Sequence, residues 1–160
     1  MVLENINIRL LTEEFLPQVI KIDELCFGGL WSIETYKREI RSPNSCLLIL
    51  TIDDNQKQNQ VIGIGCFWAI LEEAHITLLA VHPDFQSQGL GKLILENLLS
   101  QAKEKSLERA TLEVAESNSK AISLYQKFGF KEAGRRKKYY KATNEDALIL
   151  WKNLLTTLPI

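Results

Sequence analysis

The chain has 160 residues, of which 46% are hydrophobic and 24% are charged, as is typical of a globular protein that forms its own core. Its formal net charge of −1 gives no general attraction to nucleic acid or to anionic membranes. The cysteines are widely spaced, without a CxxC or Cys/His cluster, and no run approaches the ~20 apolar residues of a membrane span. We expect one cytoplasmic domain over residues 1–160, with no metal site, disulfide framework, nucleic-acid binding or membrane contact.

Apolar periodicity and breaker residues predict seven strands and four helices. In chain order these are a strand at 6–11, a helix at 13–26, a helix that follows Ser32 and ends before Pro43, strands at 45–52, 61–71 and 75–81, a helix at 90–105, a strand at 109–114, a helix at 119–128, and strands at 130–140 and 147–152. The order βααβββαβαββ predicts an α/β fold of the α+β type, in which a mixed sheet carries helices on both faces.

Local signals support several of these boundaries. The Gly28-Gly29 pair is expected to end the first helix, and Ser32 is the expected N-cap of the second. Gly129 is a plausible glycine just beyond the end of the fourth helix. A polar loop at residues 53–60 separates two strand-like runs, so it predicts a long hairpin and not a domain linker.

A glycine-rich stretch joins the strand at 75–81 to the amphipathic helix that follows it. Gly89 and Gly91 lack a Cβ atom, so the backbone can turn tightly and approach a ligand closely. The free N–H groups of the first helical turn, together with the helix dipole, favour a phosphate or pyrophosphate there. Lys92 adds a cation. A glycine-rich connection without a ligand is the structural alternative.

The amino-acid sequence of this loop can be compared with the motifs of known phosphate-binding loops. A Walker A loop requires Ser or Thr after its lysine, whereas Leu93 follows Lys92 here. A Rossmann fingerprint requires a third glycine, which is missing. The remaining pattern is Q-x-x-G-x-G, formed by Gln86, Ser87, Gln88, Gly89, Leu90 and Gly91. It resembles the acetyl-CoA pyrophosphate loop of the GNAT superfamily.

A second motif, within residues 112–130, resembles the closing motif of the same superfamily, LxV…N…A…LYxxxGF. The matching residues after the strand are Asn118, Ala121, Leu124, Tyr125, Gly129 and Phe130. Both motifs occur in the family's order and spacing, and the resemblance covers nearly the whole chain. It implies the GNAT fold, with a mostly antiparallel twisted sheet, and it implies an N-acetyltransferase that uses acetyl-CoA as its cosubstrate.

Within the superfamily the chain looks most like the RimI type, bacterial enzymes that acetylate the N-terminal alanine of a ribosomal protein. The resemblance implies that Glu113 is the general base and Tyr125 the general acid. It implies a cofactor site formed by Leu79, Ala80, Val81, Gln86, Ser87, Gln88, Gly89, Leu90, Gly91, Lys92 and Asn118. The acceptor is expected to be a protein N-terminus, with that of a ribosomal protein as a candidate. His82, Lys141 and residues 26–31 depart from the family pattern near the acceptor side.

Each of these side chains also has a purely structural interpretation. Glu113 could be a solvent-facing strand residue, Tyr125 a helix aromatic that packs its ring, and Asn118 only a helix N-cap. The basic segment at residues 131–141 could guide an acidic partner, contact nucleotide phosphate, or be a solvated strand. Tyr139 and Tyr140 are candidates for lining the acceptor groove.

We expect direct attack of the amine on the thioester in a ternary complex. An α-amine titrates near ~7.7–8.0 and a lysine near ~10.4, so a lysine costs roughly 3–4 kcal/mol more to deprotonate at neutral pH. A single carboxylate, acting directly or through water, is better matched to the deprotonation of an α-amine than to that of a lysine. The N–H of Val81 is the expected donor to the oxyanion.

Three other functions remain open from the sequence. The acceptor could be a small amine, such as a polyamine or antibiotic, or a lysine side chain. The chain could also be a module that binds acetyl-CoA without catalysis, although Glu113 and Tyr125 argue against this. The oligomeric state is not predictable from these residues.

Overall fold

The computed structural model describes residues 5–53 and 59–155. Its elements follow in the order β1 (Ile6–Leu10), α1 (Leu16–Phe27), α2 (Ile33–Arg41), β2 (Ser45–Ile52), β3 (Gln60–Ile70), β4 (Glu73–Val81), α3 (Leu90–Glu104), β5 (Arg109–Ala115), α4 (Ser119–Lys127), β6 (Lys131–Tyr140) and β7 (Glu145–Asn153). This is the predicted order. The predicted loop between β2 and β3 lies partly outside the described residues, because it includes residues 54–58.

Capping residues act largely as the sequence indicates. Ser32 caps α2 by accepting a hydrogen bond from the N–H of Thr35 at 3.2 Å. Gly28 ends α1 with a left-handed φ of 70°. The first helix starts later than predicted, because Glu13–Phe15 form a separate 3-10 turn. Pro17 then lies in the first turn of α1, where its missing N–H costs nothing.

One seven-stranded sheet runs through the molecule in the order β1-β2-β3-β4-β5-β7-β6. The β4–β5 pair is parallel, whereas every other neighbouring pair is antiparallel. Strands β2 and β3 pair antiparallel, as expected for the predicted hairpin. These pairings confirm the prediction of a mixed, mostly antiparallel sheet.

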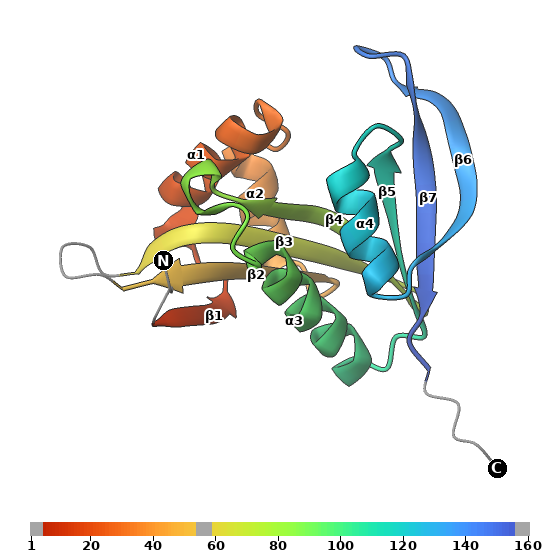
Figure 1. Ribbon diagram of the computed structural model, residues 1–160. Coiled ribbons are helices and arrows are strands. Elements are labelled where there is room, and N and C mark those ends of the chain that lie inside the picture. Colours follow the sequence, from red (N-terminus) through yellow and green to blue (C-terminus); the bar gives the residue numbers. More distant parts are fainter. Residues whose placement is uncertain (1–4, 54–58, 156–160) are drawn as a thin grey trace.

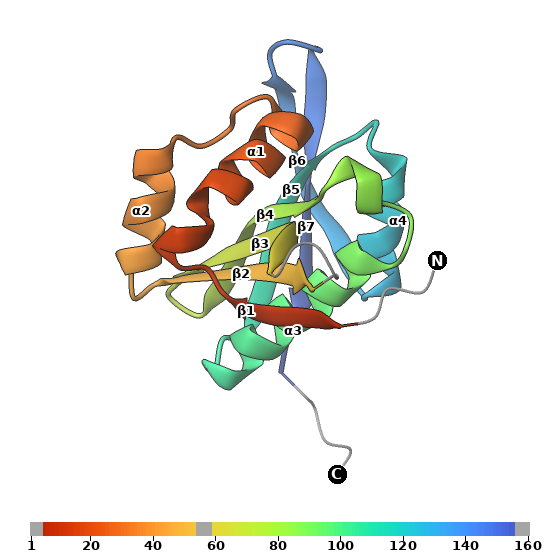
Figure 2. The ribbon, with the colours of Figure 1, turned by 90° about the vertical axis from the view of Figure 1, so that its left-hand side faces the viewer.

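Helices cover both faces of the sheet, as predicted (Figures 1 and 2). On β2, Leu48 and Leu50 belong to the core cluster that includes the apolar face of α3, whereas Leu47 and Ile49 pack with α1 and α2. This alternation is the period of two that a strand buried on both faces requires. Helix α4 contributes Tyr125 to the α3 side.

Helix α3 packs closely against β3, because Gly65 leaves no side chain between them. A Cβ atom built on Gly65 would collide with Ile94 and would lie 3.0 Å from Cδ1 of Leu98. This contact fixes the height of α3 above the sheet, and with it the position of the helix N-terminus.

The parallel strands β4 and β5 pair over only part of their length. Their ladder joins Glu73 to Arg109, Ala74 to Ala110 and His75 to Thr111, and ends there. Beyond it β4 continues to Val81 and β5 continues to Ala115, and the two strands diverge (Figure 1). The gap exposes main-chain edges and side chains of both strands to the same space.

The described residues show neither a membrane-spanning helix nor a cluster of metal ligands. None of the helices in residues 5–53 and 59–155 is both long and apolar enough to cross a bilayer. Across the same described residues, no three His, Cys, Asp or Glu side chains are grouped so that they could hold a metal ion.

Candidate active site

A cleft of about 760 Å³ occupies the space between the diverging strands. It is lined by parts of β4, β5, α3 and α4, by the loop that precedes α3, and by side chains from the end of α1, the α1–α2 connection (residues 28–32) and β6. The predicted site residues in its lining are Leu79, Ala80, Val81, Gln86, Ser87, Gly89, Leu90, Gly91, Lys92, Glu113, Asn118 and Tyr125. The structure thus brings nearly all of them together, and only Gln88 is not part of the lining.

The glycine-rich loop presents the start of α3 to the cleft. Gly89 is the N-cap of α3 with a φ of 80°, and no side chain caps the helix there. Ser87 also has a left-handed φ, of 64°. A Cβ atom at Gly89 would meet nothing within 4 Å, so this position opens into free space. The first N–H groups of a 15-residue helix are therefore available to an anion at this end of the cleft.

The end of β4 turns main-chain groups toward the cleft. His82 donates its N–H to the carbonyl oxygen of Ile62 on β3 at 2.8 Å. Since alternate residues of an antiparallel strand bond to a given neighbour, the N–H and C=O of Val81 face away from β3. The Val81 oxygen accepts hydrogen bonds from Nε2 of Gln86 at 3.0 Å and from Sγ of Cys26 at 3.4 Å. Gln86 therefore fixes the loop to the strand end.

Glu113 projects from β5 into the cleft, on the face opposite the buried Leu112 and Val114. Its carboxylate oxygen Oε1 lies 2.9 Å from Nε of Arg136 on β6, and its side chain is 29% exposed. The carboxylate is thus both accessible and oriented. Glu113 is an exposed residue of β5, as its structural interpretation expects, and it also lines the cleft and pairs with Arg136.

Tyr125 on α4 lines the same cleft as Glu113 on β5 and Tyr140 on β6. It is 8% exposed, and its ring packs edge-on against Phe130 with a centroid distance of 5.8 Å. Burial, with a smaller contribution from Tyr140, raises the pKa of Tyr125 to about 12. Burial and the nearby Glu113 carboxylate also raise the pKa of Tyr140. Both phenols therefore keep their protons at physiological pH and can donate hydrogen bonds.

Asn118 caps α4 and lies at the cleft at the same time. Its Oδ1 accepts a hydrogen bond from the N–H of Ala121 at 3.2 Å. Its structural interpretation as an N-cap is therefore correct, and its place in the cleft lining is compatible with ligand contact as well.

The sequence did not identify the wall of the cleft formed by Phe27 and Leu30. These side chains are 39% and 54% exposed, which is high for large apolar groups. The one available signal was that residues 26–31 depart from the family pattern. Tyr140 also lines the cleft whereas Tyr139 is not in its lining, so Tyr140 remains the candidate for lining the acceptor groove.

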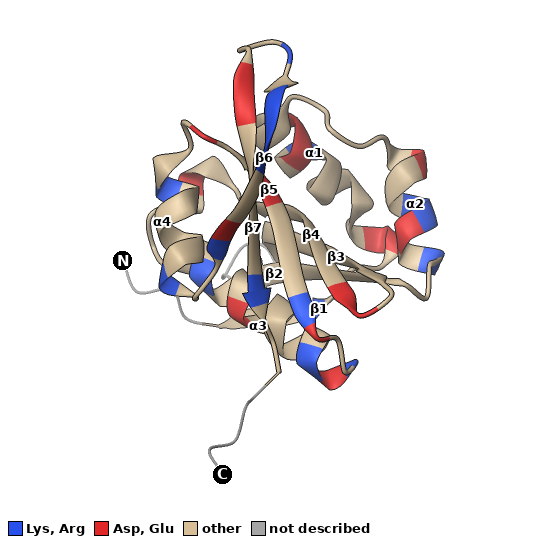
Figure 3. Cartoon of the chain, turned by 90° about the vertical axis from the view of Figure 1, so that its right-hand side faces the viewer, with Lys and Arg blue, Asp and Glu red and all other residues tan. Residues whose placement is uncertain are grey.

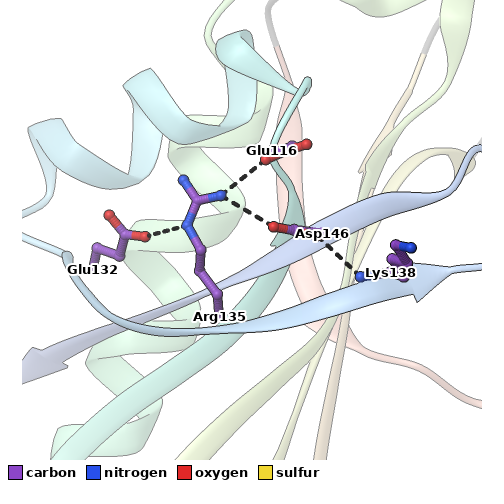
Figure 4. A network of polar contacts seen from close by, with 5 residues as sticks. All are labelled: Glu116, Glu132, Arg135, Lys138 and Asp146. Atoms are coloured by element: carbon purple, nitrogen blue, oxygen red, sulfur yellow. Dashed lines mark hydrogen bonds and ion pairs between the residues drawn. The ribbon is translucent and has the colours of Figure 1, made fainter.

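The two arginines of the basic segment form ion pairs with acidic side chains of the protein. Arg135 contacts Glu116 at 3.0 Å, Glu132 at 3.1 Å and Asp146 at 3.2 Å, as Figure 4 shows. Asp146 also accepts the main-chain N–H of Lys138 at 3.0 Å, and these bonds lower the pKa of Asp146. Figure 3 shows the resulting pattern, with basic positions on β6 beside acidic positions on β7. The arginines thus brace the β6–β7 hairpin and Glu113.

The cleft brings together groups that suit a cosubstrate and groups that can exchange protons. The uncapped start of α3 suits a pyrophosphate, and the open edge of β4 suits an extended chain with amide groups. The Glu113 carboxylate and the Tyr125 hydroxyl belong to the same lining and are of the kinds that can move protons. The described residues therefore fit acetyl-CoA.

Comparison with known proteins agrees with this geometry. Residues 16–130 match the model of the acetyltransferase (GNAT) family. The chain is 43% identical over 137 residues to the ribosomal protein bS18-alanine N-acetyltransferase of Escherichia coli K12, covering 84% of this chain and 88% of that protein. It is 33% identical over 146 residues to the Salmonella typhimurium enzyme of the same name, with coverages of 90% and 95%.

Solved structures of N-acetyltransferases share the fold of this chain. The crystal structure of the ribosomal-protein-S18-alanine N-acetyltransferase from Escherichia coli superimposes with a TM-score of 0.83, at 29% identity and with 96% of each chain covered. The NatC complex bound to Gag peptide and CoA shares the fold, with a TM-score of 0.82 at 22% identity. This chain belongs to the GNAT family and is an N-acetyltransferase that depends on acetyl-CoA.

Proposed function

We propose that this enzyme acetylates the N-terminal α-amine of a protein, with the alanine of a ribosomal protein as its acceptor. The observation that carries the proposal is Glu113, the one carboxylate that the described residues contribute to the cleft lining, which lies 2.9 Å from Nε of Arg136. The names of the relatives from Escherichia coli and Salmonella typhimurium, which match most of the chain, support the choice of acceptor.

Acetyl-CoA is held, in this proposal, by the predicted set of residues. The N–H groups at the start of α3, with Ser87, Gly89 and Gly91 around them, receive the pyrophosphate. The open edge of β4 at Leu79 and Val81 bonds to the extended part of the cosubstrate. Asn118 contacts it from the start of α4.

Glu113 accepts the proton of the incoming amine, directly or through one water molecule. An α-amine has a pKa of about 7.7–8.0, so a substantial fraction of it is already neutral at physiological pH. A lysine, with a pKa of about 10.4, costs roughly 3–4 kcal/mol more to deprotonate at neutral pH. The lower cost favours the α-amine as the acceptor.

The bond changes balance within the cleft. The amine nitrogen forms a bond to the acetyl carbon, and the bond from that carbon to sulfur breaks. The N–H of Val81 stabilises the carbonyl oxygen while it carries negative charge. Tyr125 gives a proton to the departing thiolate, and the proton taken up by Glu113 balances it.

The cysteines do not supply an alternative nucleophile. Burial raises the pKa of Cys66 to about 12 and that of Cys46 to about 11, so both remain thiols. Burial also raises the pKa of Cys26, whose thiol donates to the Val81 oxygen. Transfer is therefore direct, without an acetylated enzyme.

A peptide that carries both kinds of amine tests the acceptor. It has a free N-terminal alanine and one internal lysine, and fragment masses locate the acetyl group after incubation with acetyl-CoA. We expect the acetyl group on the N-terminal nitrogen. Acetylation of the lysine, with the N-terminus unmodified, would overturn the proposed acceptor and leave the acetyltransferase assignment intact.

A further inference from the structure

Asp23 lies in the apolar stripe of α1, among side chains that form a hydrophobic core. Only 1% of its surface is exposed. Removing a carboxylate from water is costly unless hydrogen bonds replace the lost solvation. The role of this residue is therefore found in the groups that bond to it.

Three donors converge on the Asp23 carboxylate. Oδ1 accepts the main-chain N–H of Leu30 at 2.6 Å, and Oδ2 accepts the main-chain N–H of Trp31 at 3.2 Å. Oδ2 also accepts the hydroxyl of Tyr36 on α2 at 2.5 Å. A side chain of α1 thus holds both the α1–α2 connection and the helix that follows it.

The connection is shaped so that it can reach Asp23. Gly28 and Gly29 have φ values of 70° and 92°, and this left-handed pair reverses the chain directly after α1. The ring of Trp31 then stacks on that of Trp68 in β3, with a centroid distance of 6.1 Å. The main-chain N–H of Trp31 is fixed by Asp23, and its ring is fixed by the sheet.

This arrangement determines one wall of the cleft. Leu30, whose N–H is bound to Asp23, and Phe27, at the end of α1, both line the cleft. Tyr140 and Glu113 lie in the same lining. Asp23 itself does not belong to the lining, so it can act on the cleft only through the residues that it holds.

We propose that Asp23 is a positioning residue for the acceptor, because it fixes the main chain at Leu30, in the wall against which the acceptor binds. The proposal rests on the proposed function in that it assigns this wall to the acceptor. The acetyl-CoA side, formed by α3, α4 and the glycine-rich loop, makes no bond to Asp23 among the contacts of the described residues. Loss of the Asp23 bonds should therefore affect the two substrates differently.

The test uses Asp23→Asn, which keeps the shape of the side chain but replaces one accepting oxygen with an amide group that donates. We expect the KM for the acceptor peptide to rise about tenfold or more, which corresponds to the loss of one charge-assisted hydrogen bond. The KM for acetyl-CoA should stay within about twofold. Hydrogen exchange at the amides of Leu30 and Trp31 should become faster.

Two further variants separate positioning from general loss of stability. Val19→Ala removes a buried side chain from the same helix without touching the Asp23 bonds, so it should lower Tm and leave the acceptor KM unchanged. Tyr36→Phe removes one donor but keeps both main-chain bonds, so it should raise the acceptor KM less than Asp23→Asn.

An equal rise of acceptor KM in Val19→Ala and Asp23→Asn, at matched loss of Tm, would overturn the proposal. So would an unchanged acceptor KM in Asp23→Asn despite faster exchange at Leu30 and Trp31. If the wild-type protein acetylates a different amine from the one proposed, the same KM comparison is made with that amine. Failure of the proposed function is thereby distinguished from failure of this inference.

Discussion

Glu113 and Tyr125 differ in their surroundings, and the roles proposed for them rest on this difference. The Glu113 carboxylate is partly exposed and lies 2.9 Å from Nε of Arg136. Tyr125 is buried against Phe130 and has a raised pKa, which favours its neutral form. In the proposed mechanism Glu113 accepts a proton and Tyr125 donates one, and both side chains line the same cleft.

Glu113→Gln and Tyr125→Phe should each reduce kcat by about 10²–10⁴-fold, the usual contribution of general acid or base catalysis. Binding of acetyl-CoA should stay within about twofold of wild type in both variants, because neither changes the glycine-rich loop. Steady-state kinetics and calorimetric titration with acetyl-CoA measure the two quantities.

Matched controls for these variants lie nearby. Glu116→Gln changes an exposed carboxylate of the Arg135 network, and Tyr139→Phe changes an exposed phenol outside the cleft lining. Both should retain kcat. If Glu113→Gln and Tyr125→Phe both kept the kcat of wild type, the proposed roles of the two residues would be refuted.

The pH dependence of kcat/KM should follow the acceptor amine and not Tyr125. Activity should rise with pH through the α-amine pKa of about 7.7–8.0 and then reach a plateau. Since the pKa of Tyr125 is raised to about 12, its proton is lost only at a pH above the plateau. A profile recorded to pH 10 therefore shows one ascending limb. A descending limb below pH 10 that disappears in Tyr125→Phe would contradict this expectation.

At the scale of elements, two glycines position the site. The N-cap of α3 depends on the left-handed backbone at Gly89, and the height of α3 depends on the missing side chain at Gly65. Both are glycines for different reasons, the first conformational and the second steric. Substitutions at the two positions should therefore have different effects.

Gly89→Ala should weaken acetyl-CoA binding by about tenfold, because a side chain in the left-handed region costs roughly 1–2 kcal/mol per residue. The strain is relieved if the loop moves away from the geometry that presents the N–H groups of α3. Gly134→Ala is the control, because the φ of Gly134 is not left-handed and this residue is outside the cleft lining. Equal Kd values for the two variants, by calorimetry, would disprove the role of Gly89.

Gly65→Ala should lower the free energy of unfolding by about 1–3 kcal/mol, since its Cβ would overpack the contact between β3 and α3. Denaturant titration measures the change. Gly134→Ala in β6 should be close to neutral, because its Cβ would lie 3.7 Å from Cδ1 of Ile149. If Gly65→Ala were as stable as wild type, α3 would not rest on β3 as described.

At the scale of the whole molecule, the features that are local in sequence were predictable. The glycine-rich loop and its helix, and the Asn118 cap with its helix, are each encoded within a few neighbouring residues. Their spacing carried the family resemblance, which the comparisons confirm. The order of strands and helices followed from periodicity for the same reason.

Features that join distant segments could not be predicted in this way. The Glu113–Arg136 ion pair depends on the register of β5, β7 and β6, and the divergence of β4 and β5 depends on where their ladder ends. The bonds from Asp23 to the α1–α2 connection depend on how the chain turns at the two glycines. Periodicity reports which face of an element is apolar, and carries no information on such contacts.

Initial rates of CoA release from acetyl-CoA with three acceptors test the central claim most directly. The acceptors are a peptide with a free N-terminal alanine, the same peptide with a blocked N-terminus and one lysine, and spermidine. We predict release with the first peptide alone, with a mass gain of one acetyl group at its N-terminus. Release only with the lysine peptide or with spermidine would contradict the proposed acceptor, and no release with any of them, despite acetyl-CoA binding, would contradict acetyl transfer to these amines.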